Sequence, residues 1–101
     1  MKKILLLCSQ GMSTSLLVTK MKNAAKEKGI EVEIEASSVE KFLDKLSYYD
    51  IFLLGPQVRF RQQELHKVAS EQNKRVEVIN MMDYGTMNGK KVLEEALKAI
   101  G

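Results

Sequence analysis

One segment near the start of the sequence gathers side chains that can do chemistry. Residues 8–15 read Cys-Ser-Gln-Gly-Met-Ser-Thr-Ser, and Cys8 is the only cysteine among the 101 residues. A helix N-terminus lowers the pKa of a nearby thiol, and the thiolate that results is a competent nucleophile. Since a helix is predicted to begin inside this segment, we expect Cys8 to be a catalytic nucleophile that accepts a phosphoryl group.

The residues after Cys8 suit a bound phosphoryl group. Gly11 allows the backbone to curl so that several N–H groups converge, and the helix N-terminus adds partial positive charge. The expected phosphate-binding residues are Ser9, Gln10, Gly11, Met12, Ser13, Thr14 and Ser15. The structural alternative is that Cys8 closes a core strand as a small apolar residue, with Ser13 or Thr14 as a helix cap. The residues alone leave these two interpretations open.

The elements that must position this loop follow from the hydrophobic pattern. Strands are predicted at residues 3–8, 30–36, 50–54 and 75–80. Helices are predicted at residues 12–28, 39–46, 57–72 and 89–100, with a loop at 81–88. Gly29 is placed to end the first helix, and Ser37 or Ser38 to cap the second.

This alternation of strands and helices predicts an α/β fold, a four-stranded parallel sheet with helices on both faces. The first and third strands are apolar throughout, as interior strands must be, whereas the second and fourth alternate. Right-handed crossovers then give the strand order 2-1-3-4. Ligands bind such sheets at the carboxyl ends of the strands where the winding reverses, here at loops 8–15 and 55–61. We expect residues 1–101 to form a single domain.

Composition excludes several classes of protein. The longest apolar runs have only four or five residues, so neither a transmembrane helix nor a signal peptide is predicted, and we expect a cytoplasmic protein. One cysteine excludes an intramolecular disulfide and a multi-cysteine zinc site. A net charge of +3 with interspersed Lys and Glu argues against nucleic-acid binding. We expect no metal and no organic cofactor, and a monomer in isolation.

Four residues on the predicted rim of the loop are candidates for partner contact: Pro56, Gln57, Arg59 and Tyr84. Arg59 and Arg61 suit the steering of an acidic, phosphorylated partner surface. The structural alternatives are that Pro56 starts a helix, that the arginines lie on a solvated helix face with Phe60 packed against the loop, and that Tyr84 merely packs.

Two further residues invite functional roles that we interpret structurally. Asp83 lies on a late loop, where a phosphatase would carry its general acid, but a turn or capping role before the last helix is favoured. His66 is the only histidine and lies one position off the apolar stripe of its helix. We expect it to be a solvated helix residue.

The loop at residues 8–15 resembles the signature loop of enzyme IIB proteins of the lactose/cellobiose (chitobiose) class, which belong to the bacterial phosphoenolpyruvate-dependent sugar phosphotransferase system (PTS). Residues 54–58 (LGPQV) and 83–89 (DYGTMNG) are similar to the family as well. The Met-Ser-Thr-Ser version of the loop resembles the cellobiose/chitobiose members more than the lactose ones.

The resemblance implies a mechanism and partners. A phosphohistidine of enzyme IIA would pass its phosphoryl group to Cys8, which would pass it to a β-linked disaccharide, of the cellobiose or chitobiose type, bound in membrane enzyme IIC. The protein would thus be a protein-phosphocysteine–sugar phosphotransferase that serves sugar transport.

The sharpest alternative is a low-molecular-weight cysteine phosphatase, and a catalytically silent flavodoxin-like domain is another. The phosphatase loop reads Cys, five residues, Arg, whereas Thr14 stands at the sixth place after Cys8. That arginine clamps the phosphoryl oxygens in the transition state. Its absence favours a carrier, whose phosphocysteine must survive until the next partner arrives.

Overall fold

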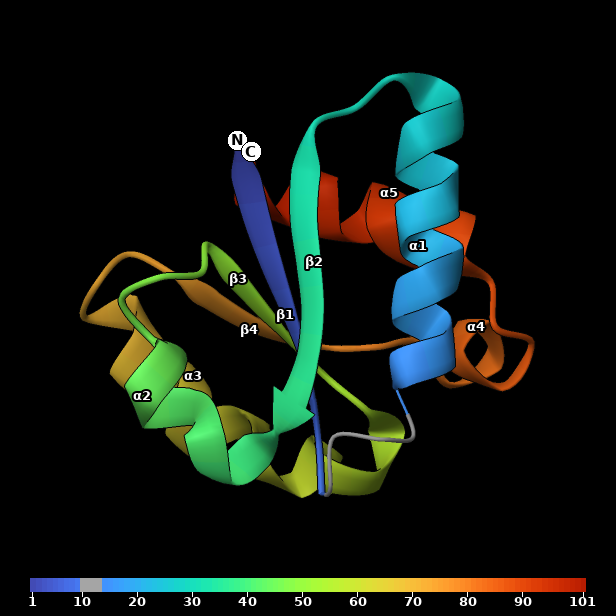
Figure 1. The fold of residues 1–101 in the computed structure, drawn as a ribbon. Coiled ribbons are helices and arrows are strands. Elements are labelled where there is room, and N and C mark those ends of the chain that lie inside the picture. Colours follow the sequence, from blue (N-terminus) through green and yellow to red (C-terminus); the bar gives the residue numbers. More distant parts are fainter. Residues whose placement is uncertain (10–13) are drawn as a thin grey trace.

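The computed structural model describes residues 1–9 and 14–101. Four strands form one parallel sheet in the order β2-β1-β3-β4 (Figure 1). Their bounds are β1 Lys2–Cys8, β2 Val32–Ser38, β3 Ile51–Leu54 and β4 Arg75–Val78. The predicted fold class and strand order are confirmed.

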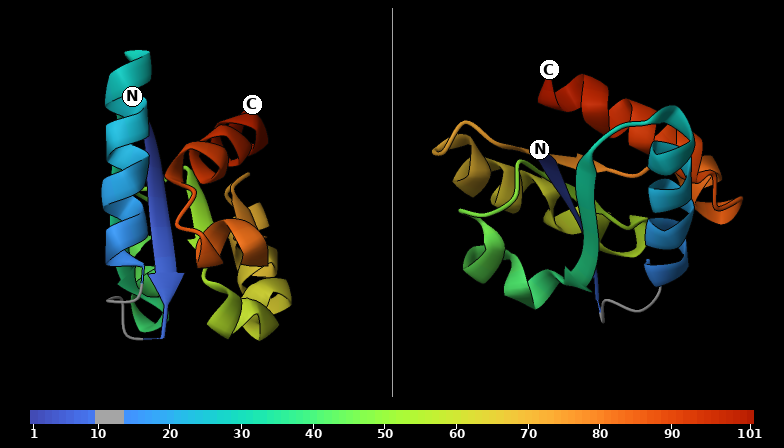
Figure 2. Two further views of the ribbon diagram at one scale, coloured as in Figure 1. Left: turned by 90° about the vertical axis from the view of Figure 1, so that its right-hand side faces the viewer. Right: turned by 45° about the horizontal axis from the view of Figure 1, so that its top comes forward.

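Helices cover both faces of the sheet. One face carries α1 (Ser15–Lys28) and α5 (Gly89–Ile100), and α4 (Met81–Gly85) lies beside them (Figures 1 and 2). The opposite face carries α2 (Phe42–Lys45) and α3 (Gln62–Ser70), together with the 3-10 helices η1 (Val39–Lys41) and η2 (Pro56–Arg61). Within residues 1–9 and 14–101, no helix has the length and apolar character needed to cross a membrane.

The alternation of side chains along β1 divides the core into two halves. Ile4 and Leu6 pack into the cluster under α1 and α5, whereas Leu5 and Leu7 pack into the cluster under α2 and α3. All four side chains are buried, because β1 lies inside the sheet and both its faces are covered. The burial of these side chains restrains β1, and with it Cys8, the last residue of the strand.

Several predicted elements differ from the structure in type or in bounds. The helix expected at residues 57–72 is divided into η2 and α3, and within η2 the backbone of Val58 leaves helical geometry (φ −118°, ψ 21°) while its side chain is buried. The loop expected at 81–88 contains α4, whose first N–H groups are capped by Asn80. The Asn80 Oδ1 atom accepts from the backbone N–H groups of Met82 (2.9 Å) and Asp83 (3.0 Å).

The strand expected at 30–36 begins later than predicted. Gly29 adopts the left-handed conformation (φ 67°) and ends α1, as predicted, but the N–H of Ile30 still donates to the carbonyl of Ala25 over 2.9 Å. Ile30 therefore belongs to the helix end, and β2 starts at Val32. At the other end of β2, the Ser38 hydroxyl accepts from Glu40 N over 3.2 Å, so Ser38 is the cap of the second helical segment.

Helices α1 and α5 are in close backbone contact at Gly89. A Cβ atom placed on Gly89 would lie 2.5 Å from the carbonyl carbon of Lys20 and 2.6 Å from the nitrogen of Met21. Both are backbone atoms, so only glycine allows this contact. This contact restrains the position of α1, and therefore of its N-terminus, relative to the sheet.

The outer edge of β4 is covered by side chains of α3. The backbone N–H of Val76 donates to His66 Nδ1 over 3.2 Å, and Gln62 Nε2 donates to the Val76 carbonyl over 3.0 Å. His66 is half-buried. The prediction of a solvated histidine is therefore wrong. The His66 ring nitrogen accepts the hydrogen bond that a further strand would accept if β4 were not at the edge of the sheet.

Candidate active site

Cys8 lies at the carboxyl end of β1, at the point where the winding of the sheet reverses. It pairs in register with Ser38 of β2, and on the other side the N–H of Gly55, just after β3, donates to the Leu7 carbonyl over 2.8 Å. The Cys8 side chain is only 1% exposed. The structure thus places the predicted nucleophile between two strand ends that hold its backbone from both sides.

The Thr14 hydroxyl donates to the sulfur of Cys8. The Thr14 Oγ1 atom lies 3.9 Å from Cys8 Sγ, and Thr14 is 0% exposed. Thr14 occupies the N-cap position of α1 but makes no side-chain capping hydrogen bond. The plain capping interpretation of Thr14 is therefore wrong, and its hydroxyl is directed at the thiol, where a hydrogen bond favours the thiolate form.

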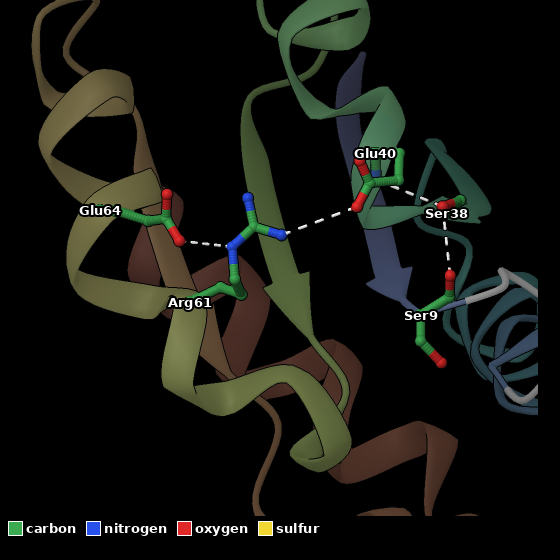
Figure 3. Close-up of polar contacts among 5 residues, drawn as sticks. All are labelled: Ser9, Ser38, Glu40, Arg61 and Glu64. Carbon is green, nitrogen blue, oxygen red and sulfur yellow. Dashed lines mark hydrogen bonds and ion pairs between the residues drawn. The ribbon is translucent and has the colours of Figure 1, made fainter.

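Ser9 is held from the side of β2. The Ser38 hydroxyl donates to the carbonyl oxygen of Ser9 over 3.3 Å while it accepts from the backbone N–H of Glu40 (Figure 3). This contact extends the pairing of β1 and β2 one residue beyond Cys8. The first residue of the predicted phosphate loop is thereby fixed to the rigid sheet.

A second set of contacts links η1, which follows Ser38, to η2 and α3. The Arg61 guanidinium contacts the carboxylates of Glu64 and of Glu40, the latter over 3.9 Å (Figure 3). Two carboxylates beside one guanidinium weaken the positive electrostatic potential that a distant partner would meet. Arg61 is thus placed to tie η2 to η1 and α3, rather than to act as the isolated cation that steering of a partner needs.

The Gln57 side chain lies against Gly55, and Gly55 in turn borders Cys8. A Cβ atom on Gly55 would lie 2.7 Å from Gln57 Oε1 and 3.6 Å from Cys8 Cβ. The other end of the same amide donates from Nε2 to the Tyr84 hydroxyl over 3.0 Å. Two of the predicted rim residues are therefore joined to each other, across the gap between η2 and α4.

The remaining rim residues take different positions. Pro56 is buried at the first position of η2, the structural role considered for it. The Arg59 guanidinium donates to the Pro56 carbonyl over 3.1 Å. Phe60 is 78% exposed, so the interpretation that it packs against the loop is wrong.

Large apolar side chains stand exposed on the elements that begin at the carboxyl edge of the sheet. Four of them are Leu16 of α1, Phe60 of η2, and Met81 and Met82 of α4, while Met1, Leu43 and Tyr48 are exposed on other segments. Each element directly follows a strand end or the cysteine loop, so all three frame the same edge (Figure 1). Sequence reasoning missed this set because a buried and an exposed apolar residue look the same in a pattern.

Four predicted phosphate-binding residues, Gln10, Gly11, Met12 and Ser13, lie outside the described residues. Ser15 is the first residue of α1 and is exposed, and its carbonyl accepts from Thr19 Oγ1 over 3.4 Å. Asp83 lies in the first turn of α4, and the cap of α5 is Asn88, whose Oδ1 accepts from Lys91 N over 3.1 Å. Of the two roles expected for Asp83, the cap of the last helix is therefore wrong, whereas its carbonyl accepts from Asn88 N over 2.8 Å in the turn before α5.

Metal binding has no support in the ranges 1–9 and 14–101. No group of three or more His, Cys, Asp or Glu side chains in these ranges is placed to hold an ion.

Comparisons with known proteins agree with this geometry. The family model described as "PTS system, Lactose/Cellobiose specific IIB subunit" matches residues 3–95. The oligo-beta-mannoside-specific EIIB component of Bacillus subtilis (strain 168) is 54% identical over 97 residues, which cover 96% of this chain and 94% of the relative. The galactose-specific EIIB component of Lactococcus lactis subsp. cremoris is 46% identical over 100 residues, with coverage of 94% and 93%.

A solved structure shows the same fold. The solution structure of the cellobiose-specific phosphotransferase IIB component from Borrelia burgdorferi superimposes with a TM-score of 0.81, at 41% identity, and the match covers 98% of this chain and 91% of that one. The match of family, sequence and fold extends over nearly the whole chain. The chain therefore belongs to the lactose/cellobiose-specific IIB family of the PTS, and it is a phosphocarrier of sugar phosphotransfer.

Proposed function

We propose that Cys8 is the residue on which this phosphocarrier holds the phosphoryl group. The observation that carries the proposal is the buried contact of Thr14 Oγ1 with Cys8 Sγ, 3.9 Å, at the N-terminus of α1. The hydroxyl hydrogen and the helix dipole both favour negative charge at this point. The same features stabilise the thiolate before transfer and the phosphoryl oxygens after it.

The donor in this proposal is a phosphohistidine of an enzyme IIA. The Cys8 thiolate attacks phosphorus, an S–P bond forms, and the N–P bond breaks. The electron pair of the N–P bond returns to the imidazole nitrogen, and a proton on the other ring nitrogen lets the imidazole leave as a neutral group. Ser9, Thr14 and Ser15, with the loop residues 10–13, are the proposed ligands of the phosphoryl oxygens.

The acceptor is a sugar hydroxyl held by the membrane enzyme IIC. The hydroxyl oxygen attacks phosphorus, the S–P bond breaks, and the electron pair returns to sulfur as the Cys8 thiolate, while the hydroxyl proton passes to a base of enzyme IIC or to water. We propose a β-linked disaccharide of the cellobiose or chitobiose type. The loop composition supports this choice, and one relative is named for cellobiose and another for a β-mannoside.

Docking of both partners would use the exposed apolar set of Leu16, Phe60, Met81 and Met82. Met82 and Phe60 are 76% and 78% exposed, which is a large apolar area to leave in water near a buried nucleophile. Burial of this apolar area against a partner would supply binding free energy. Close docking is also needed because the partner's phosphoryl group has to reach the buried sulfur of Cys8. Gln57, Arg59 and Tyr84 lie on the same rim.

The test is intact mass after incubation with phosphoenolpyruvate, the general PTS proteins and a cognate enzyme IIA. One phosphoryl group on the wild type that is absent from Cys8→Ser supports the proposal, and Ser70→Ala, at the exposed end of α3, serves as the control with an intact thiol. Phosphorylation of Cys8→Ser at an unchanged rate would overturn it. Turnover of a generic aryl phosphate by the wild type would indicate a cysteine phosphatase instead.

A further inference from the structure

We propose that the Gln57 side-chain amide donates a hydrogen bond to the phosphoryl group on Cys8, and that the Tyr84 hydroxyl sets the orientation of this amide. The inference rests on the proposed role of Cys8 as the phosphoryl acceptor. It assigns to Gln57 a direct contact with the transferred group, and to Tyr84 a positioning role.

The first support is the place that the amide occupies. A Cβ atom on Gly55 would lie 2.7 Å from Gln57 Oε1 and 3.6 Å from Cys8 Cβ, so the Gln57 amide and the Cys8 side chain both border the space beside Gly55. Gly55 has ordinary extended dihedral angles (φ −61°, ψ 150°), so its backbone does not require glycine. The glycine matters here because a Cβ at this position would displace the Gln57 amide from the space that it shares with Cys8.

The second support is the contact at the far end of the amide. Gln57 Nε2 donates to the Tyr84 hydroxyl over 3.0 Å. An amide has one donor end and one acceptor end, whereas a phenol hydroxyl both donates and accepts. If the amide turns over, Oε1 accepts from the same hydroxyl and the N–H groups face Cys8. The pair therefore keeps its hydrogen bond in either orientation.

Charge decides which orientation each state of Cys8 selects. A phosphoryl group on the sulfur brings close to two negative charges and several acceptor oxygens, which repel the carbonyl end of an amide and bind its N–H end. A hydrogen bond from a neutral donor to a charged acceptor is stronger than one between neutral groups. We therefore infer that the amide turns its donors to Cys8 when the phosphoryl group arrives.

The experiment measures the equilibrium of phosphoryl transfer between enzyme IIA and this protein, from the phosphorylated fraction of each by intact mass. Gln57→Glu keeps the shape but replaces the donors by a charge. We expect it to shift the equilibrium away from this protein by about tenfold to a hundredfold. Tyr84→Phe should shift it in the same direction by less. Gln63→Glu, an exposed glutamine of α3, is the matched control for the added charge.

Gly55→Ala gives an independent test without a change of charge. The new Cβ meets only the far end of the flexible Gln57 side chain at close range, since its other neighbours lie at 3.5 Å or more. The variant should fold, displace the amide and weaken phosphoryl retention. In the double variant Gly55→Ala/Gln57→Leu, the loss should not exceed that of Gln57→Leu alone, because both changes remove the same contact.

The ³¹P chemical shift of the phosphocysteine reports the contact directly and should change in Gln57→Leu but not in Gln63→Glu. Unchanged shifts and unchanged equilibria in the Gln57 and Gly55 variants, with wild-type protein phosphorylated on Cys8, would overturn the inference and leave the proposed function intact. Failure of the wild type to take up phosphoryl on Cys8 would instead overturn the proposed function.

Discussion

The hydroxyl of Ser38 donates to the carbonyl oxygen of Ser9 over 3.3 Å, and Ser9 is the residue that follows Cys8. A side chain at the end of an edge strand therefore anchors the residue at which the central strand becomes the cysteine loop (Figure 3). The backbone on the other side of Cys8 is anchored by Gly55 N–H on the Leu7 carbonyl. The sulfur is thus carried on a segment with little freedom to move.

Ser38→Ala should loosen this anchor. It removes one hydrogen bond to Ser9 and one cap of η1, and we expect a loss of about 1 kcal/mol in the free energy of unfolding. The rate of phosphorylation by enzyme IIA should fall by up to about fivefold, the factor reached when the whole of this energy is lost from the transition state. Urea unfolding and stopped-flow phosphorylation measure the two effects. Ser38→Thr should restore both, and a full-rate Ser38→Ala would show that the anchor has no part in transfer.

Thr14→Val should reduce the thiolate population of Cys8. The substitution keeps the shape of a fully buried side chain and removes the hydroxyl that contacts Cys8 Sγ. Since this hydrogen bond favours the charged form of the sulfur, the thiolate fraction at neutral pH should fall about fivefold. Thiolate absorbance at 240 nm measures it, with Cys8→Ser as the blank. Thr14→Ser should behave as the wild type, and equal absorbance in Thr14→Val would contradict this account.

Gly89→Ala should be strongly destabilising, while Gly85→Ala should be mild. The new Cβ at residue 89 would overlap backbone atoms of Lys20 and Met21, whereas at residue 85 nothing lies within 4 Å. Overpacking of this kind costs about 1–3 kcal/mol, because one helix must shift. Thermal unfolding of both variants measures the difference. Similar melting temperatures for the two would mean that α5 moves away from α1 without loss.

Acid should weaken the contact between α1 and α5. The hydrogen bond from Lys28 Nζ (2.8 Å) and the charge of that ammonium group hold the pKa of Glu94 below its ordinary value of 4.5. A carboxyl with a lowered pKa in the folded state adds stability above its unfolded pKa, and this stability is lost as the pH falls through the folded value. Glu94→Gln should therefore be less stable than the wild type at pH 7 and equal to it near pH 3.

The control for this pH dependence is Glu27→Gln, which removes one carboxylate from the exposed side of α1. Urea unfolding from pH 7 to pH 3 follows the difference between each variant and the wild type. Both partners of the Lys28–Glu94 pair are partly exposed, so 1 M NaCl should also reduce the difference. A difference between Glu94→Gln and wild type that stays constant down to pH 3 would refute the assignment.

The sheet was predictable from sequence because its interior strands differ in composition from its edges. The runs around Leu5 and Phe52 are apolar on both faces, which only interior strands require, and this asymmetry fixes the strand order. The position of Cys8 at the end of the first of these strands then follows from the connectivity alone. The apolar pattern of each strand agrees with its place in the sheet, so the strand order and the position of Cys8 could be predicted without a structure.

The contacts around Cys8 could not be predicted in the same way. Helix α4 carries exposed Met81 and Met82 and has no buried side chain, so it shows no apolar periodicity to detect. The approach of Gln57 to Gly55 and Tyr84 depends on how η2 and α4 meet, which no local signal encodes. The role of His66 was missed for the same reason, since its hydrogen-bond partner Val76 lies ten residues away on another element.

The cover that α3 places over β4 has a consequence for how the protein behaves at high concentration. An uncovered edge strand offers its N–H and C=O groups to any other strand and invites chains to join edge to edge. Here both groups of Val76 are engaged by His66 and Gln62. The opposite edge, β2, carries the charges of Glu33 and Glu35, so neither border of the sheet is a good template for aggregation. With both borders blocked in this way, the sheet can present its carboxyl end, which carries Cys8, without its edges pairing with strands of other chains.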